Sequence, residues 1–144
     1  MSLRTVPNSE PRRAVLDTYA WIEYFRGSAE GSAVSKYLEN GFQPFTPSIV
    51  IAELSDKYRR EGINEWPIRR SFIKLKSKIL HLDELTADRA GELKQTLRKK
   101  FKDAGLADAI VWAHSLQNDA LVITGDKHLR EMDNAVNLKK VPEV

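Results

Sequence analysis

Short, mainly apolar runs alternate along the chain with longer segments of helical periodicity. The runs have the length of strands and occupy residues 13–16, 42–45, 79–82, 121–124 and 136–138. Between them, apolar residues recur at helical spacing over residues 19–26, 32–40, 46–60, 65–78 and 86–101. Residues 106–117 are apolar nearly all round, which predicts a buried helix. Strands and helices that alternate in this way predict an α/β fold with a parallel sheet covered on both faces.

Residue chemistry predicts where two of the helices start. Thr46 precedes Pro47, so we expect the Thr46 hydroxyl to cap free amides and Pro47 to take the first helical position, where no N–H is missed. Thr86 is predicted to cap the helix that runs to about Phe101. Residues 102–105 then form a linker to the buried helix.

Length and composition indicate one globular domain. The chain has 144 residues, of which 42% are hydrophobic and 30% charged. No apolar run approaches the roughly 20 residues that cross a bilayer, and the start of the chain lacks the hydrophobic centre of a signal peptide. We therefore expect a cytoplasmic protein in which residues 1–12 form a flexible N-terminal extension and residues 13–144 a single domain.

The net charge of +3 understates the basic character of the surface. Lys and Arg gather in clusters along the predicted helices: Arg59, Arg60, Arg69, Arg70, Lys74, Lys76, Lys78, Arg98, Lys99, Lys100 and Lys102. Two interpretations stay open. The clusters contact the phosphate backbone of a nucleic acid, or they simply solvate helix faces.

Four acidic residues stand at the edges of apolar stretches. Asp17 follows the first predicted strand, and Asp126 lies just beyond the strand at 121–124. Asp108 falls in the first turn of the buried helix, where the helix dipole favours a negative group, and Glu53 borders the apolar stripe of its own helix. Because ligands of open α/β sheets collect at the carboxyl ends of the strands, we expect all four to meet there.

Carboxylates that meet in this way repel one another unless a cation lies between them. The chain has no cysteine, so the ligands of a metal ion would be oxygen or imidazole, and carboxylates favour Mg²⁺ or Mn²⁺. A divalent ion that keeps some of its waters also binds phosphate oxygens and activates water. The implied reaction is hydrolysis of a phosphodiester bond.

Each acidic residue also has a purely structural interpretation. Asp17 can form a turn at a strand end, Asp108 can complement a helix dipole, and Asp126 can cap the turn that follows it. Glu53 can pair with Lys57. Among the other polar residues, Asp103 is predicted to be a loop residue. His81, His114 and His128 are assigned no catalytic role, and Trp21, Trp66 and Trp112 are expected to fill the core.

Four segments resemble, in order and spacing, the acidic motifs of PIN-domain ribonucleases, and VapC toxins of prokaryotic toxin–antitoxin pairs in particular. They are Val15-Leu16-Asp17-Thr18, Pro47-Ser48-Ile49-Val50-Ile51-Ala52-Glu53-Leu54, Gly105-Leu106-Ala107-Asp108-Ala109-Ile110 and Leu121-Val122-Ile123-Thr124-Gly125-Asp126-Lys127-His128-Leu129. The resemblance covers about residues 14–141. In one respect the chain departs from the family, since about a dozen residues precede the first strand.

The resemblance implies a three-layer α/β/α sandwich with a central parallel sheet of four to five strands. It implies a homodimeric ribonuclease that uses Mg²⁺ or Mn²⁺ and is held inactive by an antitoxin. Asp17 and Asp108 would then be direct metal ligands, Glu53 and Asp126 would complete the site, and Thr18 and Thr124 would support carboxylates or waters by hydrogen bonds.

Two other classes of function are alternatives to the nuclease. One is a catalytically silent domain that binds RNA or a partner protein and keeps the acidic pocket. The other is a phosphoaspartate receiver or a haloacid-dehalogenase-like phosphotransferase, which also has an Asp after the first strand. The receiver needs adjacent acids before that Asp, and the phosphotransferase needs an Asp where Tyr19 stands, so neither matches the sequence.

Overall fold

The computed structural model of the chain describes residues 12–140. Its strands are β1 (Arg13–Leu16), β2 (Gln43–Pro47), β3 (Lys78–Leu80), β4 (Leu121–Thr124) and β5 (Ala135–Asn137). Its α-helices are α1 (Thr18–Arg26), α2 (Ala29–Glu39), α3 (Ser48–Arg60), α4 (Trp66–Lys76), α5 (Glu84–Lys100) and α6 (Leu106–Gln117), and a 3₁₀ turn, η1 (Leu138–Lys140), follows β5.

The five strands form one parallel sheet in the order β3-β2-β1-β4-β5. The chain builds outward from β1 to β3 on one side, then crosses back through α5 and α6 to add β4 on the other side of β1. The strand order therefore reverses between β1 and β4. In open α/β sheets, this reversal point at the carboxyl ends of the strands is where ligands bind.

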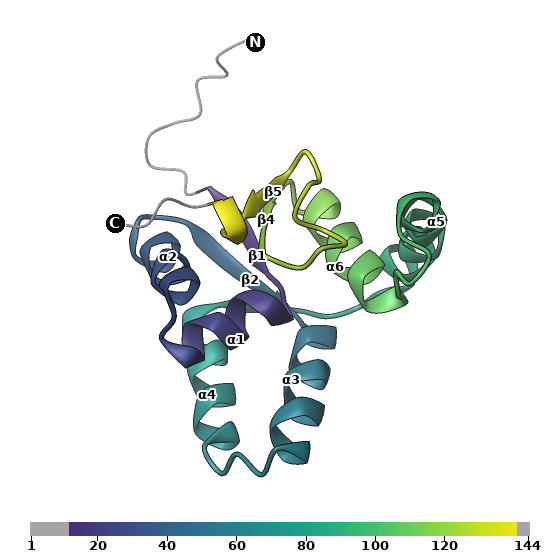
Figure 1. The fold of residues 1–144 in the computed structure, drawn as a ribbon. Coiled ribbons are helices and arrows are strands. Elements are labelled where there is room, and N and C mark those ends of the chain that lie inside the picture. Colours follow the sequence, from purple (N-terminus) through teal and green to yellow (C-terminus); the bar gives the residue numbers. More distant parts are fainter. Residues whose placement is uncertain (1–11, 141–144) are drawn as a thin grey trace.

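Helices cover the sheet as the alternating pattern predicts. In Figure 1, α1 and α2 lie on the left of the sheet, α5 and α6 lie on the right, and α3 with α4 extends below it. Buried side chains of β1 and β4, among them Val15, Leu16, Val122 and Ile123, form the centre of the core with Trp21 of α1. The predicted three-layer α/β/α fold with a parallel sheet is thus confirmed.

The first of the two predicted helix starts is displaced because Thr46 has a different partner. Thr46 and Pro47 belong to β2, and α3 begins at Ser48 without a side-chain cap. The buried Thr46 hydroxyl instead interacts with Ser77 Oγ at 2.6 Å and accepts a hydrogen bond from Trp21 Nε1 at 3.1 Å. A buried hydroxyl needs such partners, and these come from segments far apart in the sequence.

The predicted cap at Thr86 is also wrong. Asp83 caps α5 by accepting a hydrogen bond from the Thr86 N–H at 2.8 Å, so the helix begins earlier, at Glu84. The Thr86 hydroxyl is hydrogen-bonded to Gln117, near the end of α6. Asp and Thr are both good caps, and the structure assigns them different contacts.

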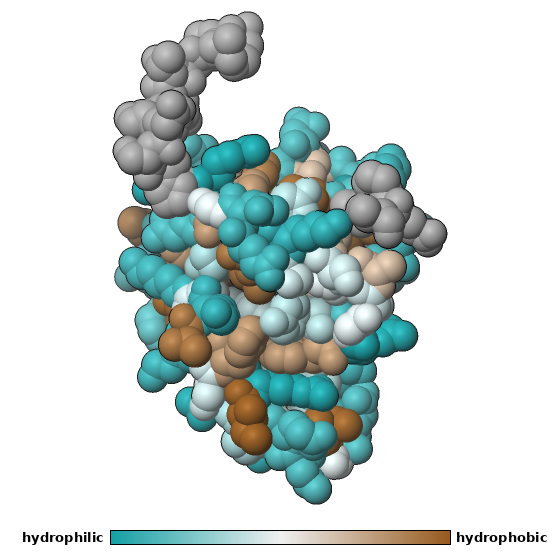
Figure 2. Space-filling view, turned by 90° about the vertical axis from the view of Figure 1, so that its left-hand side faces the viewer, coloured by the Kyte–Doolittle hydropathy of each residue, from teal (hydrophilic) through white to brown (hydrophobic). Residues whose placement is uncertain are grey.

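The surface of the described region is mixed in character. Figure 2 shows a largely hydrophilic face with separate apolar patches in its lower half. On α4, Ile68 and Leu75 leave 73% and 78% of their surface exposed. None of the helices in residues 12–140 has the length and apolar character that crossing a membrane requires. The predicted flexible extension, residues 1–12, lies outside the described residues except for Arg12.

Candidate functional site

Asp17 stands at the carboxyl end of β1, where it also caps α1. Its Oδ1 accepts a hydrogen bond from the backbone N–H of Ala20 at 2.9 Å, which is the usual geometry of a helix N-cap. Asp17 therefore has a structural role, but as the N-cap of α1 and not as the turn former that the sequence suggested. This role occupies only one of the two carboxylate oxygens.

The second oxygen of Asp17 faces β4. The register pairs Leu16 with Ile123, so the next residues along, Asp17 and Thr124, are neighbours across the two strands. The Thr124 hydroxyl donates to Asp17 Oδ2, and both side chains are buried. Burial raises the pKa of Asp17 to about 7, although its two hydrogen bonds lower it, and the carboxylates of Asp126 and Asp108 add to the rise.

Asp126 lies in the turn that follows β4. Its backbone N–H donates to Thr124 Oγ1 at 2.9 Å, so one threonine connects Asp17 and Asp126. Asp126 Oδ1 accepts a hydrogen bond from the backbone N–H of His128 at 2.8 Å and lies 3.0 Å from His128 Nδ1. Asp126 thus also organises its own turn, as its structural interpretation proposed.

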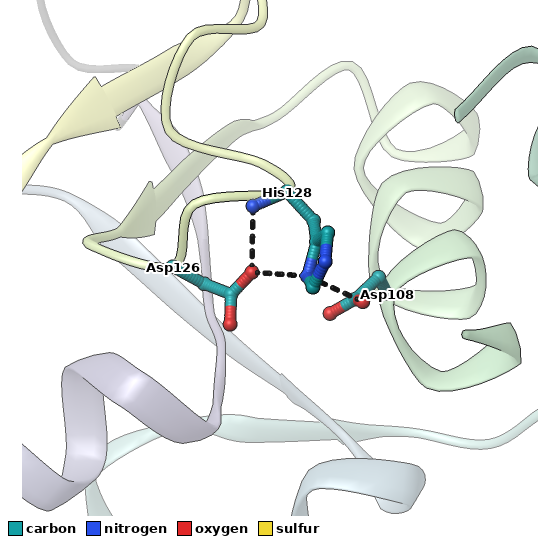
Figure 3. A group of neighbouring side chains, drawn as sticks. All are labelled: Asp108, Asp126 and His128. Atoms are coloured by element: carbon teal, nitrogen blue, oxygen red, sulfur yellow. Dashed lines mark hydrogen bonds and ion pairs between the residues drawn. The ribbon is translucent and has the colours of Figure 1, made fainter. Parts of the chain in front are cut away.

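Asp108 is the third residue of α6 and lies across the His128 imidazole from Asp126 (Figure 3). Its Oδ2 accepts a hydrogen bond from the backbone N–H of Gly105, the N-cap residue, at 3.5 Å and lies 3.2 Å from His128 Nδ1. Burial, together with the Asp126 carboxylate, raises the pKa of Asp108 to about 6, although His128 lowers it. Figure 3 shows the imidazole between the two carboxylates.

Glu53 reaches the site from the second turn of α3. The Thr18 hydroxyl donates to Glu53 Oε1, and the Glu53 charge contributes to the raised pKa of Asp108. The alternative pairing of Glu53 with Lys57 is wrong, because Lys57 forms its ion pair with Glu61 at 2.5 Å. Thr18 and Thr124 each hydrogen-bond one of the four acids.

The four acids are not equally close to one another. Within residues 12–140, one group of ligand atoms lies mutually within 4.8 Å, and it comprises Asp108, Asp126 and His128. Asp17 and Glu53 lie beside this group: the carboxylates of Asp126 and Asp108 raise the pKa of Asp17, and the Glu53 carboxylate raises the pKa of Asp108. The site is therefore a tight pair of carboxylates around an imidazole, with two further carboxylates beside it.

His128 and Asp103 also contact this site, although the sequence predicts no catalytic role for His128 and only a loop position for Asp103. His128 Nε2 lies 3.0 Å from Asp103 Oδ1, and Asp103 Oδ2 pairs with Lys127 at 3.0 Å. Burial lowers the pKa of His128, but Asp103, Asp108 and Asp126 together raise it above its usual value. The only signal in the sequence was the spacing of His128, two residues after Asp126 in a tight turn.

These residues fit a divalent cation. Asp17 and Asp108 have raised pKa values because they are buried and face other carboxylates, and a cation would relieve that repulsion. The donor atoms are carboxylate oxygens and one imidazole nitrogen, a set that suits Mn²⁺ and, through its oxygens, Mg²⁺.

Comparison with known proteins agrees with this geometry. The PIN domain family model matches residues 14–135, which include all four acidic motifs. No curated protein matches the chain by sequence.

Several solved structures share the fold. A toxin–antitoxin complex from Klebsiella pneumoniae has a chain that is 22% identical, with a TM-score of 0.68 and coverage of 89% of this chain and 99% of that one. VapBC-1 from nontypeable Haemophilus influenzae is 21% identical, with a TM-score of 0.63 and the same coverage. VapC20 of Mycobacterium tuberculosis, described as a Sarcin-Ricin loop cleaving toxin, is 16% identical over 78% of this chain and 87% of its own, with a TM-score of 0.61. At these identities the likeness shows a shared fold.

Proposed function

The chain belongs to the PIN domain family, and from the acidic site we propose that it is an endoribonuclease that depends on Mg²⁺ or Mn²⁺. The observation that carries this proposal is the convergence of Asp17, Glu53, Asp108 and Asp126 at the point where the strand order reverses. We further propose that residues 13–144 form one nuclease domain.

Asp108, Asp126 and His128 would hold the cation, with Asp17 and Glu53 as further carboxylates beside it. A bound divalent ion supplies Lewis-acid activation of a phosphodiester and of water. The chain's own residues set the geometry in advance. Thr124 fixes the orientation of Asp17, and Thr18 fixes that of Glu53, so little reorganisation is needed when RNA binds.

Basic residues in the segments that precede Asp108 and follow Asp126 support a polyanionic substrate. The last turn of α5 exposes Arg98, Lys99 and Lys100, and the linker after it leads directly to α6 and Asp108. Lys127 follows Asp126 in the chain and pairs with Asp103. Such groups bind phosphates without reading sequence, which suits a nuclease that positions an RNA backbone over the cation.

We propose that the protein is the toxin of a toxin–antitoxin pair and works as a homodimer. Support comes from the fold that it shares with chains of toxin–antitoxin complexes from Klebsiella pneumoniae and Haemophilus influenzae. The exposed apolar residues Ile68 and Leu75 of α4 are of the kind that a partner protein covers. The second candidate, a catalytically silent RNA-binding or partner-binding domain, is favoured by the same basic and apolar surfaces.

Cleavage of RNA distinguishes the two candidates. With Mn²⁺, we expect the wild-type protein to cut a labelled RNA, EDTA to stop the reaction, and Asp17→Asn to lower the rate by at least about 100-fold, since a carboxylate beside the cation is lost. Asp56→Asn, which removes an exposed aspartate of α3 paired with Arg60, is the matched control and should cleave normally.

Equal cleavage by the wild type and Asp17→Asn would reveal a contaminating nuclease. RNA binding by the wild type without any cleavage would favour the silent domain.

A further inference from the structure

The ring of Tyr19 packs directly on Gly125, the residue that joins β4 to Asp126. A Cβ atom at position 125 would lie 2.3 Å from Tyr19 Cε1 and 2.5 Å from Tyr19 Cζ, far inside contact distance. Gly125 is itself buried. The ring therefore occupies the space that any other residue at position 125 would need.

Tyr19 is held in this place by contacts from two other elements. Its hydroxyl donates to Glu30 Oε1 of α2 at 2.8 Å. Lys139 of η1 places its Nζ 5.5 Å from the centre of the Tyr19 ring and 3.4 Å from Glu30 Oε2. An aromatic ring with a hydrogen-bonded hydroxyl and a cation over its face has little freedom to move.

Gly125 is also held at its carbonyl group. Its carbonyl oxygen accepts a hydrogen bond from Arg130 Nη1 at 3.2 Å. The residue before Gly125 is Thr124, whose hydroxyl donates to Asp17. The residue after it is Asp126, whose Oδ1 lies 3.0 Å from His128 Nδ1. A shift of the Gly125 peptide would thus change the separation of Asp126 from Asp17 and Asp108.

We propose that Tyr19 is a positioning residue of the acidic site: its ring, fixed by Glu30 and Lys139, determines where the Gly125 peptide and hence the Asp126 carboxylate lie. The inference rests on the proposed function in one respect, that the acids bind a divalent cation. The placement of Asp126 by Tyr19 stands on packing alone.

The first test is Mn²⁺ binding measured by calorimetry. Tyr19→Ala removes the ring, and we expect about 10-fold weaker binding, the scale of effect seen when groups that orient metal ligands are lost. Tyr19→Phe keeps the ring on Gly125 and should bind Mn²⁺ nearly as the wild type does. Tyr37→Ala is the matched control, because Tyr37 of α2 packs on Phe42 away from the acids, and it should leave Mn²⁺ affinity unchanged.

The second test changes the side-chain volume at positions 19 and 125, singly and together. Gly125→Ala alone must displace the ring and should weaken Mn²⁺ binding, whereas Gly125→Ala combined with Tyr19→Ala leaves room for the new methyl group. We expect the double variant to bind no more weakly than either single variant. If Tyr19→Ala does not fold, Tyr19→Leu, which keeps bulk but not the flat ring, takes its place.

A metal-free measurement separates this proposal from the nuclease assignment. In ¹H–¹⁵N spectra of the apo protein, Tyr19→Ala should move the amide signals of His128 and Leu129, whose N–H groups donate to Asp126 Oδ1 and to the Asp126 carbonyl oxygen, and Tyr19→Phe should leave them near their wild-type positions. Unmoved signals in Tyr19→Ala, or Mn²⁺ affinity equal to the wild type, would overturn the positioning role. A wild type that binds no Mn²⁺ would overturn the proposed function, and the amide signals would still decide the role of Tyr19.

Discussion

At the scale of single residues, Asp17 illustrates a conflict between folding and function. The two hydrogen bonds that it accepts, from Ala20 and Thr124, favour its charged form. Burial disfavours that form by more, so the pKa of Asp17 rises to about 7. A charged carboxylate in these surroundings destabilises the metal-free protein, and a bound cation would favour its charged form.

The stability of the metal-free protein should therefore depend on pH through Asp17. An acid whose folded-state pKa is raised binds more protons in the folded state, so the free energy of unfolding falls as pH rises from about 4 to about 7. Asn at position 17 carries no charge at any pH. We expect Asp17→Asn, measured by urea unfolding in EDTA, to become more stable relative to the wild type across this range.

The comparison with Asp17→Asn cancels the titration of distant groups, since both proteins share them. A stability difference that stays constant between pH 4 and pH 7 would mean that Asp17 titrates as it does in the unfolded chain. An asparagine variant that fails to fold at any pH would make the capping of α1 the main role of Asp17.

At the scale of elements, α1 and α2 pack against each other at Gly31. A Cβ atom there would lie 2.1 Å from the backbone oxygen of Glu23, and backbone atoms cannot move aside as a flexible side chain can. Ser28 between the two helices caps α2 by accepting the Gly31 N–H at 3.1 Å, and its hydroxyl also bonds Glu23. The packing of α1 against α2 at Gly31 places Glu30 beside Tyr19, which in turn packs on Gly125 next to Asp126.

Gly31→Ala should accordingly be destabilising. We expect a loss of about 1–3 kcal/mol in the free energy of unfolding, because the two helices must separate to admit a methyl group. Gly91→Ala in α5 is the matched control. A Cβ atom at Gly91 meets nothing within 4 Å, so that variant should gain about 0.5–1 kcal/mol from better helix propensity. Urea denaturation of the two variants side by side measures both values, and a stable Gly31→Ala would disprove close packing at this corner.

At the scale of the whole molecule, the sheet order brings the acids together. Asp17 and Asp126 follow adjacent parallel strands at the same edge of the sheet, while Glu53 and Asp108 lie on α3 and α6, two helices that contact each other. A cation bound among them would connect segments that are far apart in the sequence. Binding of this kind stabilises only the folded state.

Mn²⁺ should therefore stabilise the protein in proportion to the logarithm of its concentration. At 100 times the Kd we expect about 2.7 kcal/mol, a rise in Tm of roughly 5–10 °C, and EDTA should reverse it. Differential scanning fluorimetry measures this, with Asp108→Asn expected to lose most of the shift. A wild-type Tm that does not change when Mn²⁺ is added would contradict the proposed metal site.

Local patterns in the sequence were enough to predict most of the fold. The ranges 13–16, 106–117 and 121–124 were predicted to the residue, since each is a run whose apolar character requires burial. Other bounds differ by one to three residues, and the two wrong helix caps are Thr46 and Thr86, hydroxyl residues with several possible partners. Which partner each takes depends on residues about 30 positions away, and the sequence pattern does not carry that information.

The candidate site, too, was predictable from the sequence only in part. The sequence alone determined which carboxylates border the core and that strand ends would bring them to one edge of the sheet, because strand and helix periodicity follow from local physical chemistry. Only the tertiary structure decided that His128 lies between Asp108 and Asp126, that Asp103 faces its other nitrogen, and that Tyr19 packs on Gly125. Those contacts depend on distances of a few ångströms between side chains from separate elements, and such distances are set only when the elements pack.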